Sequence, residues 1–156
     1  MSDVPAYLEV HDAIMAILQG GMNDQLARFG EAALPDAAFV PVVQGDPIQD
    51  TICAAYSGAR REPEQSAFRD SEVIYTINIW AFGADDDAAQ SRAIALEAAA
   101  IAVLDDRENR YLAGACSQPI SLGDTRCATA EDQQSPNLMW HLGFPVLCPV
   151  RTSRPE

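Results

Sequence analysis

Apolar residues recur at helical spacing near the start of the chain. Between residues 4 and 20 they fall three, four or seven positions apart, so they share one stripe of a helix. The stripe consists of Tyr7, Val10, Ile14, Ile17 and Leu18. Gly20-Gly21 is expected to end this helix, because glycine adopts a left-handed C-cap at little cost. A short helical turn is expected to follow at residues 23–28.

A second helix is predicted over residues 86–106, where apolar residues again recur at helical spacing and alanines favour close packing on a sheet. Asp85-Asp86-Asp87 come just before it. Carboxylates at this position cap free N–H groups and meet the positive end of the helix dipole. A cation site is the alternative interpretation. It is disfavoured because three consecutive carboxylates lack the alternating spacing and the glycine of a calcium loop.

The clearest strand pattern covers residues 72–82, where side chains alternate between two faces. One face carries Val73, Tyr75, Ile77 and Ile79, and the other carries Thr76, Asn78 and Trp80. Weaker strand patterns, bounded by turn residues, occur at 38–44, 48–56, 110–116, 120–128 and 137–150. Proline lacks an amide donor, so Pro145 and Pro149 predict that the last strand is an edge strand or is bulged.

The predicted element order is α-β-β-β-α-β-β-β, which indicates the α+β class with a mostly antiparallel sheet flanked by two helices. The length of 156 residues is typical of one domain. We therefore expect a single domain over residues 1–150 and a short tail at 151–156. The polar, turn-rich stretch 57–71 is expected to form a long mobile loop.

The composition narrows the function classes. With 48% hydrophobic and 21% charged residues, the chain should fold, and its formal charge of −13 disfavours nucleic-acid binding, which requires phosphate neutralisation. The longest apolar stretch, 93–104, is too short for a membrane span and contains Glu97. Residues 1–5 lack the basic region of an export signal, so no export is expected and the protein is expected to be made in the cytoplasm.

Candidate chemistry is sparse. His11 and His141 have no partner ligand at metal-binding spacing, and no nucleotide-binding or nucleophile-elbow motif occurs. A nucleophile pair of Cys148 with His141 is the one alternative, and it is disfavoured because both lie in an apolar strand that fits a core. We expect no catalytic, cofactor or metal site, and so no enzyme. The four cysteines, which are widely spaced, are expected to be reduced and mostly buried.

The stretch 57–71 carries the residues that we expect to contact a partner. They are Arg60, Arg61, Glu62, Glu64 and Arg69. A long charged loop is free to reach a neighbour, which favours a docking role. A solvated loop without function is the alternative, because no motif marks these residues.

The layout resembles the tail terminator and neck proteins of long-tailed bacteriophages. The resemblance is carried by the strand Val73-Ile74-Tyr75-Thr76-Ile77-Asn78-Ile79-Trp80-Ala81, which runs directly into the alanine-rich helix 86–106. The closing strand, Trp140-His141-Leu142-Gly143-Phe144-Pro145-Val146, fits the same pattern. Roughly residues 4–150 are covered, and the stretch 57–71 and the two prolines of the closing strand depart from the usual family pattern.

The resemblance implies a structural virion protein at the head–tail junction. It would form a ring, of six subunits, that caps the tail tube, ends its polymerisation and meets the head connector. Its partners would be its own copies, the tube protein and the connector, and DNA would pass through without specific binding. The negative charge would then line part of the DNA channel.

Three other functions stay open at this point. A non-viral acidic adaptor would be a stable monomer that forms no ring. A head-completion or neck protein shares the size and the ring, but binds on the head side. A small cytosolic ligand-binding protein or enzyme would instead carry a site on the loops at 57–71 and 129–136.

Overall fold

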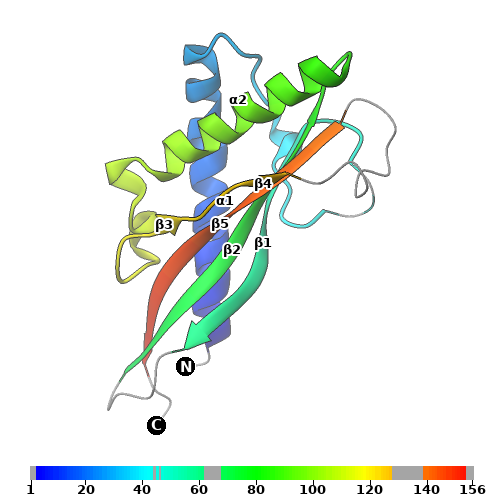
Figure 1. Ribbon diagram of the computed structural model, residues 1–156. Helices are drawn as coiled ribbons and strands as arrows, with labels where there is room; N and C mark the ends of the chain where they lie inside the picture. The colour runs from blue at the N-terminus through cyan, green and yellow to red at the C-terminus, as the bar shows by residue number, and fades with distance from the viewer. Residues whose placement is uncertain (1–2, 44, 46, 62–67, 128–138, 154–156) are drawn as a thin grey trace.

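Two long helices cover one face of a five-stranded antiparallel sheet (Figure 1). The structure is a computed structural model, and it describes residues 3–43, 45, 47–61, 68–127 and 139–153. The sheet order is β1-β2-β5-β3, and β4 also pairs with β5. The predicted α+β class is confirmed.

Helix α1 spans Asp3–Arg28 and continues through Gly20-Gly21, so the predicted end at residue 20 is wrong. The reason is packing, because a Cβ added to Gly21 would lie 3.0 Å from a methyl group of Val103 in the second helix. Glycine at this position therefore lets the two helices approach closely. The helix ends instead before Gly30, whose φ of +73° closes a Schellman motif with the Glu31 N–H bonded to the Leu26 carbonyl at 2.9 Å.

Helix α2 spans Asp86–Leu104, within the predicted range. Asp85 is its N-cap, and its carboxylate accepts a hydrogen bond from the Ala88 N–H at 2.7 Å. The capping role predicted for the aspartate triplet is therefore present at Asp85. Gly83 sits tight against the first turn, since an added Cβ would overlap the backbone of Ala88 and Ala89.

The three long strands are β1 (Thr51–Arg61), β2 (Phe68–Phe82) and β5 (Met139–Ser153). The loop predicted over residues 57–71 is therefore wrong for 57–61 and 68–71, while 62–67 lie outside the described residues. Cross-strand backbone pairing extends the strands past their apolar parts, and Arg60 pairs with Glu72 across β1 and β2. Such an opposite-charge pair is a favourable sheet neighbour. The register shifts once, between Tyr56 and Gly58.

Three weaker strand predictions differ from the structure. Residues 38–44 contribute only a single bridge from Phe39 to Ile52, after the 3-10 turn η1 (Asp36–Ala38). The segment 110–116 contains the 3-10 turn η3 (Leu112–Gly114), held by the Cys116 N–H bonded to the Tyr111 carbonyl. The segment 120–128 forms two short strands. The remaining elements are η2 (Arg107–Asn109), β3 (Ser121–Leu122) and β4 (Arg126–Cys127).

Strand β5 lies inside the sheet, so the predicted edge position is wrong, and its register with β2 shows no bulge. The carbonyls of Pro145 and Pro149 accept bonds from Gly123 and Ser117, both on the β3 side of β5. A residue directs its N–H and C=O to the same edge of a strand. The missing proline donors therefore face the side where β5 is paired only by short strands, and the ladder with β2 loses nothing.

The core lies between the sheet and the two helices. Alternate residues of β2 and β5 point into it and are almost fully buried, among them Ile77, Ile79 and Phe144. They pack with the stripes of α1 and α2 in one continuous cluster. Among the described helices, none combines the length and the apolar character that a membrane span requires.

Candidate interaction surfaces

The second face of the sheet has no helix over it in the described part of the chain. On β2 and β5, the side chains of this face alternate along each strand with the buried ones. All of them are at least partly exposed. Its apolar members include Ile74, Trp80, Pro145, Leu147 and Pro149. Ile74 lies directly opposite Leu147. None of these five belongs to the core cluster. The polar residues Thr76, Asn78 and His141 lie between them, and on β1 the same face is covered, since Thr51 and Cys53 are buried. This "open face" of β2 and β5 therefore carries apolar side chains that do not serve the core.

At one end of the open face, Trp80 and His141 stack with ring centroids 4.5 Å apart and planes 8° from parallel. The Nε2 atom of His141 lies 3.1 Å from the Asn78 side-chain oxygen. Burial lowers the pKa of His141. A neutral imidazole that donates to Asn78 therefore fits this position.

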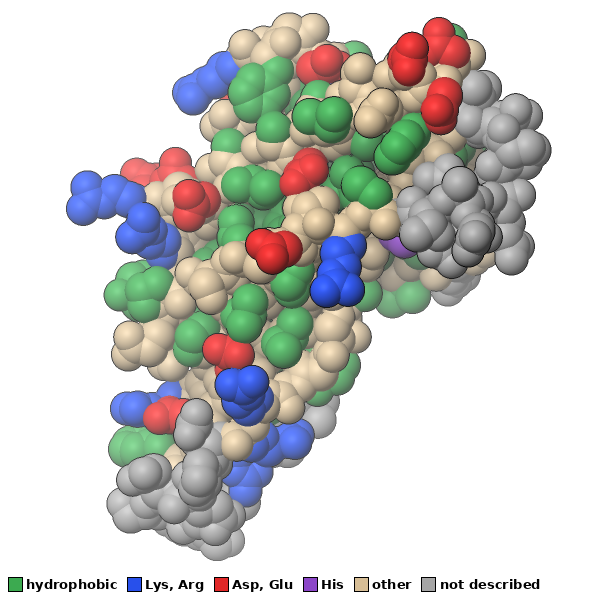
Figure 2. Space-filling model, in the orientation of Figure 1, with side chains coloured by type: hydrophobic (Ala, Val, Ile, Leu, Met, Phe, Trp, Pro, Cys, Tyr) green, Lys and Arg blue, Asp and Glu red, His purple; other side chains and the backbone are tan. Residues whose placement is uncertain are grey.

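The opposite end of the sheet gathers three of the five residues that were expected to contact a partner. Arg60 and Arg61 end β1, and Arg69 lies near the start of β2. Because β1 and β2 are antiparallel, these positions meet at one end of the sheet (Figure 2, lower end). Glu62 and Glu64 lie outside the described residues.

Arg151 of β5 joins this arginine end, and the sequence interpretation missed it. Its guanidinium makes two bonds to Asp70, at 2.7 and 3.1 Å, and lies 5.2 Å from the Phe68 ring centroid. The bond from Arg151 lowers the pKa of Asp70. The missing signal was the long-range register between β2 and β5, which sequence periodicity alone does not contain.

Helix α2 presents a second apolar surface, on the side away from the core. Ile94 is 58% exposed, and Ala98 one turn later is also exposed. The acidic residues Asp85, Asp86 and Asp87 lie at its N-terminal end (Figure 2, upper right). Gln90 and Ser91, one turn before Ile94, are exposed and polar, so the apolar part of this side is the C-terminal half of the helix. The outer side of α2 is therefore a candidate contact surface.

A groove of about 640 Å³ follows the edge of β1 and is mostly apolar. Leu8 of α1, Val42 and Tyr56 are its exposed apolar walls. Tyr75 lies in it with its hydroxyl bonded to the Tyr7 carbonyl at 2.7 Å, and burial raises its pKa to about 12. Its lining also includes polar groups, among them His11 and Asp12, whose side chains lie 3.2 Å apart.

A more polar hollow of about 610 Å³ lies between β4 and the open face. Thr76, Asn78 and His141 form its floor, with Asp124 and Arg126 at its rim. Among the described residues, no three His, Cys, Asp or Glu side chains gather in a way that could hold a metal ion.

The thiols and histidines do not form a nucleophile pair in the described structure. His141 lies on the open face and Cys148 on the buried face of the same strand, so the two point in opposite directions. Cys53, Cys116 and Cys148 are buried and free, as expected, and Cys127 is exposed. Hydrogen bonding to Cys116 and burial raise the pKa of Cys148, which makes it a poor nucleophile at neutral pH.

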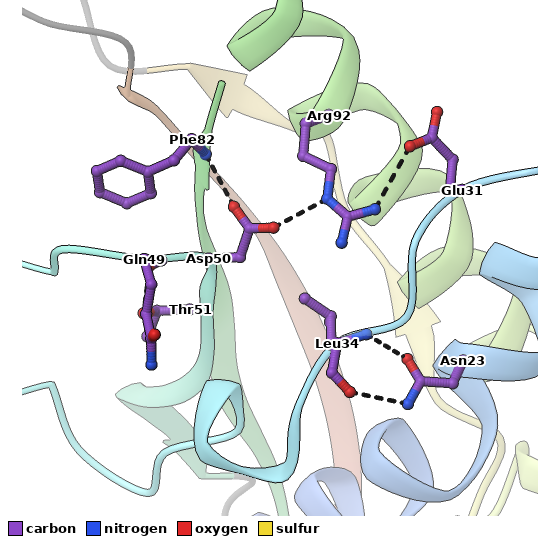
Figure 3. Close-up of polar contacts among 8 residues, drawn as sticks. All are labelled: Asn23, Glu31, Leu34, Gln49, Asp50, Thr51, Phe82 and Arg92. Carbon is purple, nitrogen blue, oxygen red and sulfur yellow. Dashed lines mark hydrogen bonds and ion pairs between the residues drawn. The ribbon is translucent and has the colours of Figure 1, made fainter. Parts of the chain in front are cut away.

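A polar cluster fastens the connection between α1 and β1 (Figure 3). Arg92 of α2 donates to Asp50 at 2.9 Å and to Glu31 at 3.4 Å, and its side chain is only 12% exposed. The other carboxylate oxygen of Asp50 accepts the Phe82 N–H at 2.9 Å. The side chain of Asn23 makes two hydrogen bonds with the backbone of Leu34. Every group here is bonded to another protein group, so the cluster is structural.

No protein-family model matches this chain, and no curated protein is similar to it in sequence.

Proposed function

We propose that this protein is a structural subunit at the head–tail junction of a long-tailed phage-like particle. Its copies form a ring that caps the tail tube, ends tube polymerisation and provides the surface on which the head connector docks. DNA passes through the ring without specific binding. The ring has six subunits, as the resemblance to tail terminators implies.

The observation that carries the proposal is the open face of the sheet. Apolar side chains of β2 and β5 are left partly exposed there, although the other face of the same strands is fully covered. Contiguous exposed apolar surface on a folded domain marks a protein–protein contact. An assembling subunit explains this surface, whereas an enzyme would require a constellation of reactive groups, and the described residues contain none that we can identify.

The charge supports the same proposal. A net charge of −13 keeps the surface from attracting phosphate, as a channel for passing DNA requires. The acidic side chains of α2 and the arginines of the sheet end lie far apart on the molecule (Figure 2), so each copy has two oppositely charged ends. A ring with a neutral or basic lumen would contradict this part of the proposal.

The test is immunogold electron microscopy of phage-like particles from the source culture, with an antibody against this chain. Label at the head–tail junction is the expected result. A deletion strain should produce particles with tails of abnormal length if the protein caps the tube. It should produce normal, unattached tails if the protein belongs to the head-completion or neck layer. Particles without any label, with the protein free in the cytosol, would rule out both structural functions.

The groove beside β1 favours a second candidate, a small-ligand-binding protein. Its volume of about 640 Å³ and its aromatic and aliphatic walls fit an apolar small molecule. A thermal-shift screen tests this candidate, because a ligand that binds only the native state raises the melting temperature. The Val42→Glu variant should abolish a shift that arises in the groove.

A further inference from the structure

We propose that α2 of one copy lies across the open face of the sheet of the next copy. This inference rests on the proposed ring, because it names the contact by which the copies join. The two surfaces are of different kinds, so the contact is heterologous, and a chain that carries both can be joined on two sides.

Each of the two surfaces lacks a covering element within the described part of its own copy. A sheet face that carries large apolar side chains can be covered by a helix layer. The open face lacks such a helix in the described residues, while α2 carries apolar side chains on the side that its own sheet does not use. Each surface therefore offers the layer that the other one lacks.

The second argument is shape. The outer stripe of α2 contains Ile94, Ala98 and Ala102, so its relief is low apart from one large side chain. The middle of the open face is also low, because Gly143 stands opposite Asn78 and Pro145 opposite Thr76. The 19 residues of α2 measure about 28 Å and the 15 residues of β2 about 50 Å. The helix therefore fits within the length of the face.

The third argument is charge. The N-terminal end of α2 carries Asp85, Asp86 and Asp87, and the far end of the sheet carries four arginines, which Asp70 and Glu72 neutralise only in part. The arginines are Arg60, Arg61, Arg69 and Arg151. With the aspartate end of α2 directed to the arginine end of the next sheet, opposite charges meet. This orientation predicts an association that weakens as salt is raised, since such exposed charges are screened.

A second copy is the occupant that satisfies all of these features at once. Contact between two α2 helices would leave both open faces uncovered and bring two aspartate ends together when the helices are parallel. Contact between two open faces would leave both α2 surfaces uncovered. The heterologous contact covers both surfaces of every copy in a closed ring, and it pairs unlike charges.

The experiment uses two full-length variants, each with one broken surface. Ile94→Glu places a charge on the α2 surface, and Leu147→Glu places one on the open face. Both positions lie outside the core cluster, so both variants should fold, which circular dichroism and thermal melting check. Ile48→Glu is the control, because Ile48 is 89% exposed and belongs to neither contact surface nor to the groove beside β1.

Sedimentation velocity at low salt gives the readout. Wild type and Ile48→Glu should form the same oligomer, and each of the other two variants should be monomeric alone. An equimolar mixture of Ile94→Glu and Leu147→Glu should form a heterodimer and stop there, because one intact helix surface meets one intact open face. This rescue in the mixture is specific to a heterologous contact between these two surfaces.

The contrary outcomes separate this inference from the proposed function. If Ile94→Glu or Leu147→Glu still assembles like wild type, the proposed contact is wrong. Immunogold labelling of the head–tail junction still tests the proposed function in that case. If the mixture of folded variants stays monomeric while wild type assembles, the contact is also wrong. A wild-type chain that stays monomeric at its highest soluble concentration, and on isolated tail tubes, overturns the inference. Assembly through this contact without any label at the head–tail junction supports the inference and contradicts the proposed function.

Discussion

The two faces of the sheet belong to the same strands and yet are built for different purposes. On β2, Ile77 is fully buried beneath the helices, whereas Ile74, three residues earlier, is partly exposed on the open face. On β5, Phe144 and Leu147 show the same contrast. The covered face stabilises the fold, and the open face is apolar without contributing to the core. A strand can therefore carry apolar residues for two reasons, and only the packing tells them apart.

The largest expected effect tests this contrast directly with a matched pair of isoleucines. Ile77→Ala should reduce the free energy of unfolding by about 3 kcal/mol, because it leaves a cavity in the core. Ile74→Ala should reduce it by less than about 1 kcal/mol, since that side chain is already in contact with water. Urea unfolding followed by circular dichroism measures both. Equal losses would mean that the open face is part of the core after all.

A smaller effect is expected from the polar cluster that fastens the covered side. Arg92→Ala should cost about 2 kcal/mol, because it leaves the half-buried carboxylate of Asp50 without its cation. Asp50→Asn should cost less, since the amide oxygen still accepts the Phe82 N–H. Arg107→Ala, at an exposed arginine, is the control and should leave the unfolding midpoint in urea unchanged. A neutral Arg92→Ala would show that the cluster does not hold the fold.

Two adjacent glycines of α1 lie on different sides of the helix. Gly21 faces α2, whereas Gly20 faces open space. Gly21→Ala should destabilise the protein by about 1 kcal/mol, because the new methyl group would press on Val103, a stiff β-branched side chain. Gly20→Ala has open space around its Cβ and should stabilise the helix by about 0.5–1 kcal/mol. Thermal unfolding of the two variants shows whether each substitution raises or lowers the stability. Stabilisation by both would mean that α1 and α2 are not in close contact at Gly21.

The smallest expected effect concerns the open face and pH. Burial lowers the pKa of His141 below its usual 6.5, so between that value and the lowered one the unfolded chain binds more protons than the folded chain. The contribution of this histidine to stability is present above pH 6.5 and is lost as the pH falls through the lowered pKa. His141→Gln should remove this component, measured as a difference from wild type in urea titrations from pH 7.5 to 4.5. A difference that stays constant over this range would contradict the assignment.

The strongly periodic parts of the chain predicted their structure well. Strand 72–82, helix 86–106 and the last strand all appear close to the predicted bounds, because their patterns reflect burial on one side. The predictions failed where tertiary contacts decide. Gly20-Gly21 looked like a stop and is a packing contact with Val103, and the polar stretch beyond Tyr56 continues as strand because β2 pairs with it.

The partner contact expected of Arg60, Arg61 and Arg69 stays a prediction, but the loop on which they were expected to lie is wrong. These three arginines were chosen because the stretch 57–71 is long and polar. In the structure they lie on β1 and β2. Arg151 joins them only through the pairing of β2 with β5, which links distant parts of the chain. The open face itself was visible in the sequence as the second side of strand 72–82, but its lack of a helix cover depends on where α1 and α2 pack. The periodicity of a sequence shows which side chains share a face of a helix or strand. It does not show which other element covers that face.

The register of β2 with β5 also has a kinetic consequence. Even the nearest pair, Phe82 with Met139, closes a loop that contains the whole of α2, β3 and β4. Such non-local pairing is slow, because the entropy of loop closure is lost before the contacts form. The hairpin of β1 and β2 has no such delay, so it can form first, and it then exposes one edge of β2 and both of its faces to the solvent. The nascent chain therefore passes through a stage in which this hairpin is prone to aggregate, and its folding yield should depend on chaperones and on the rate of synthesis.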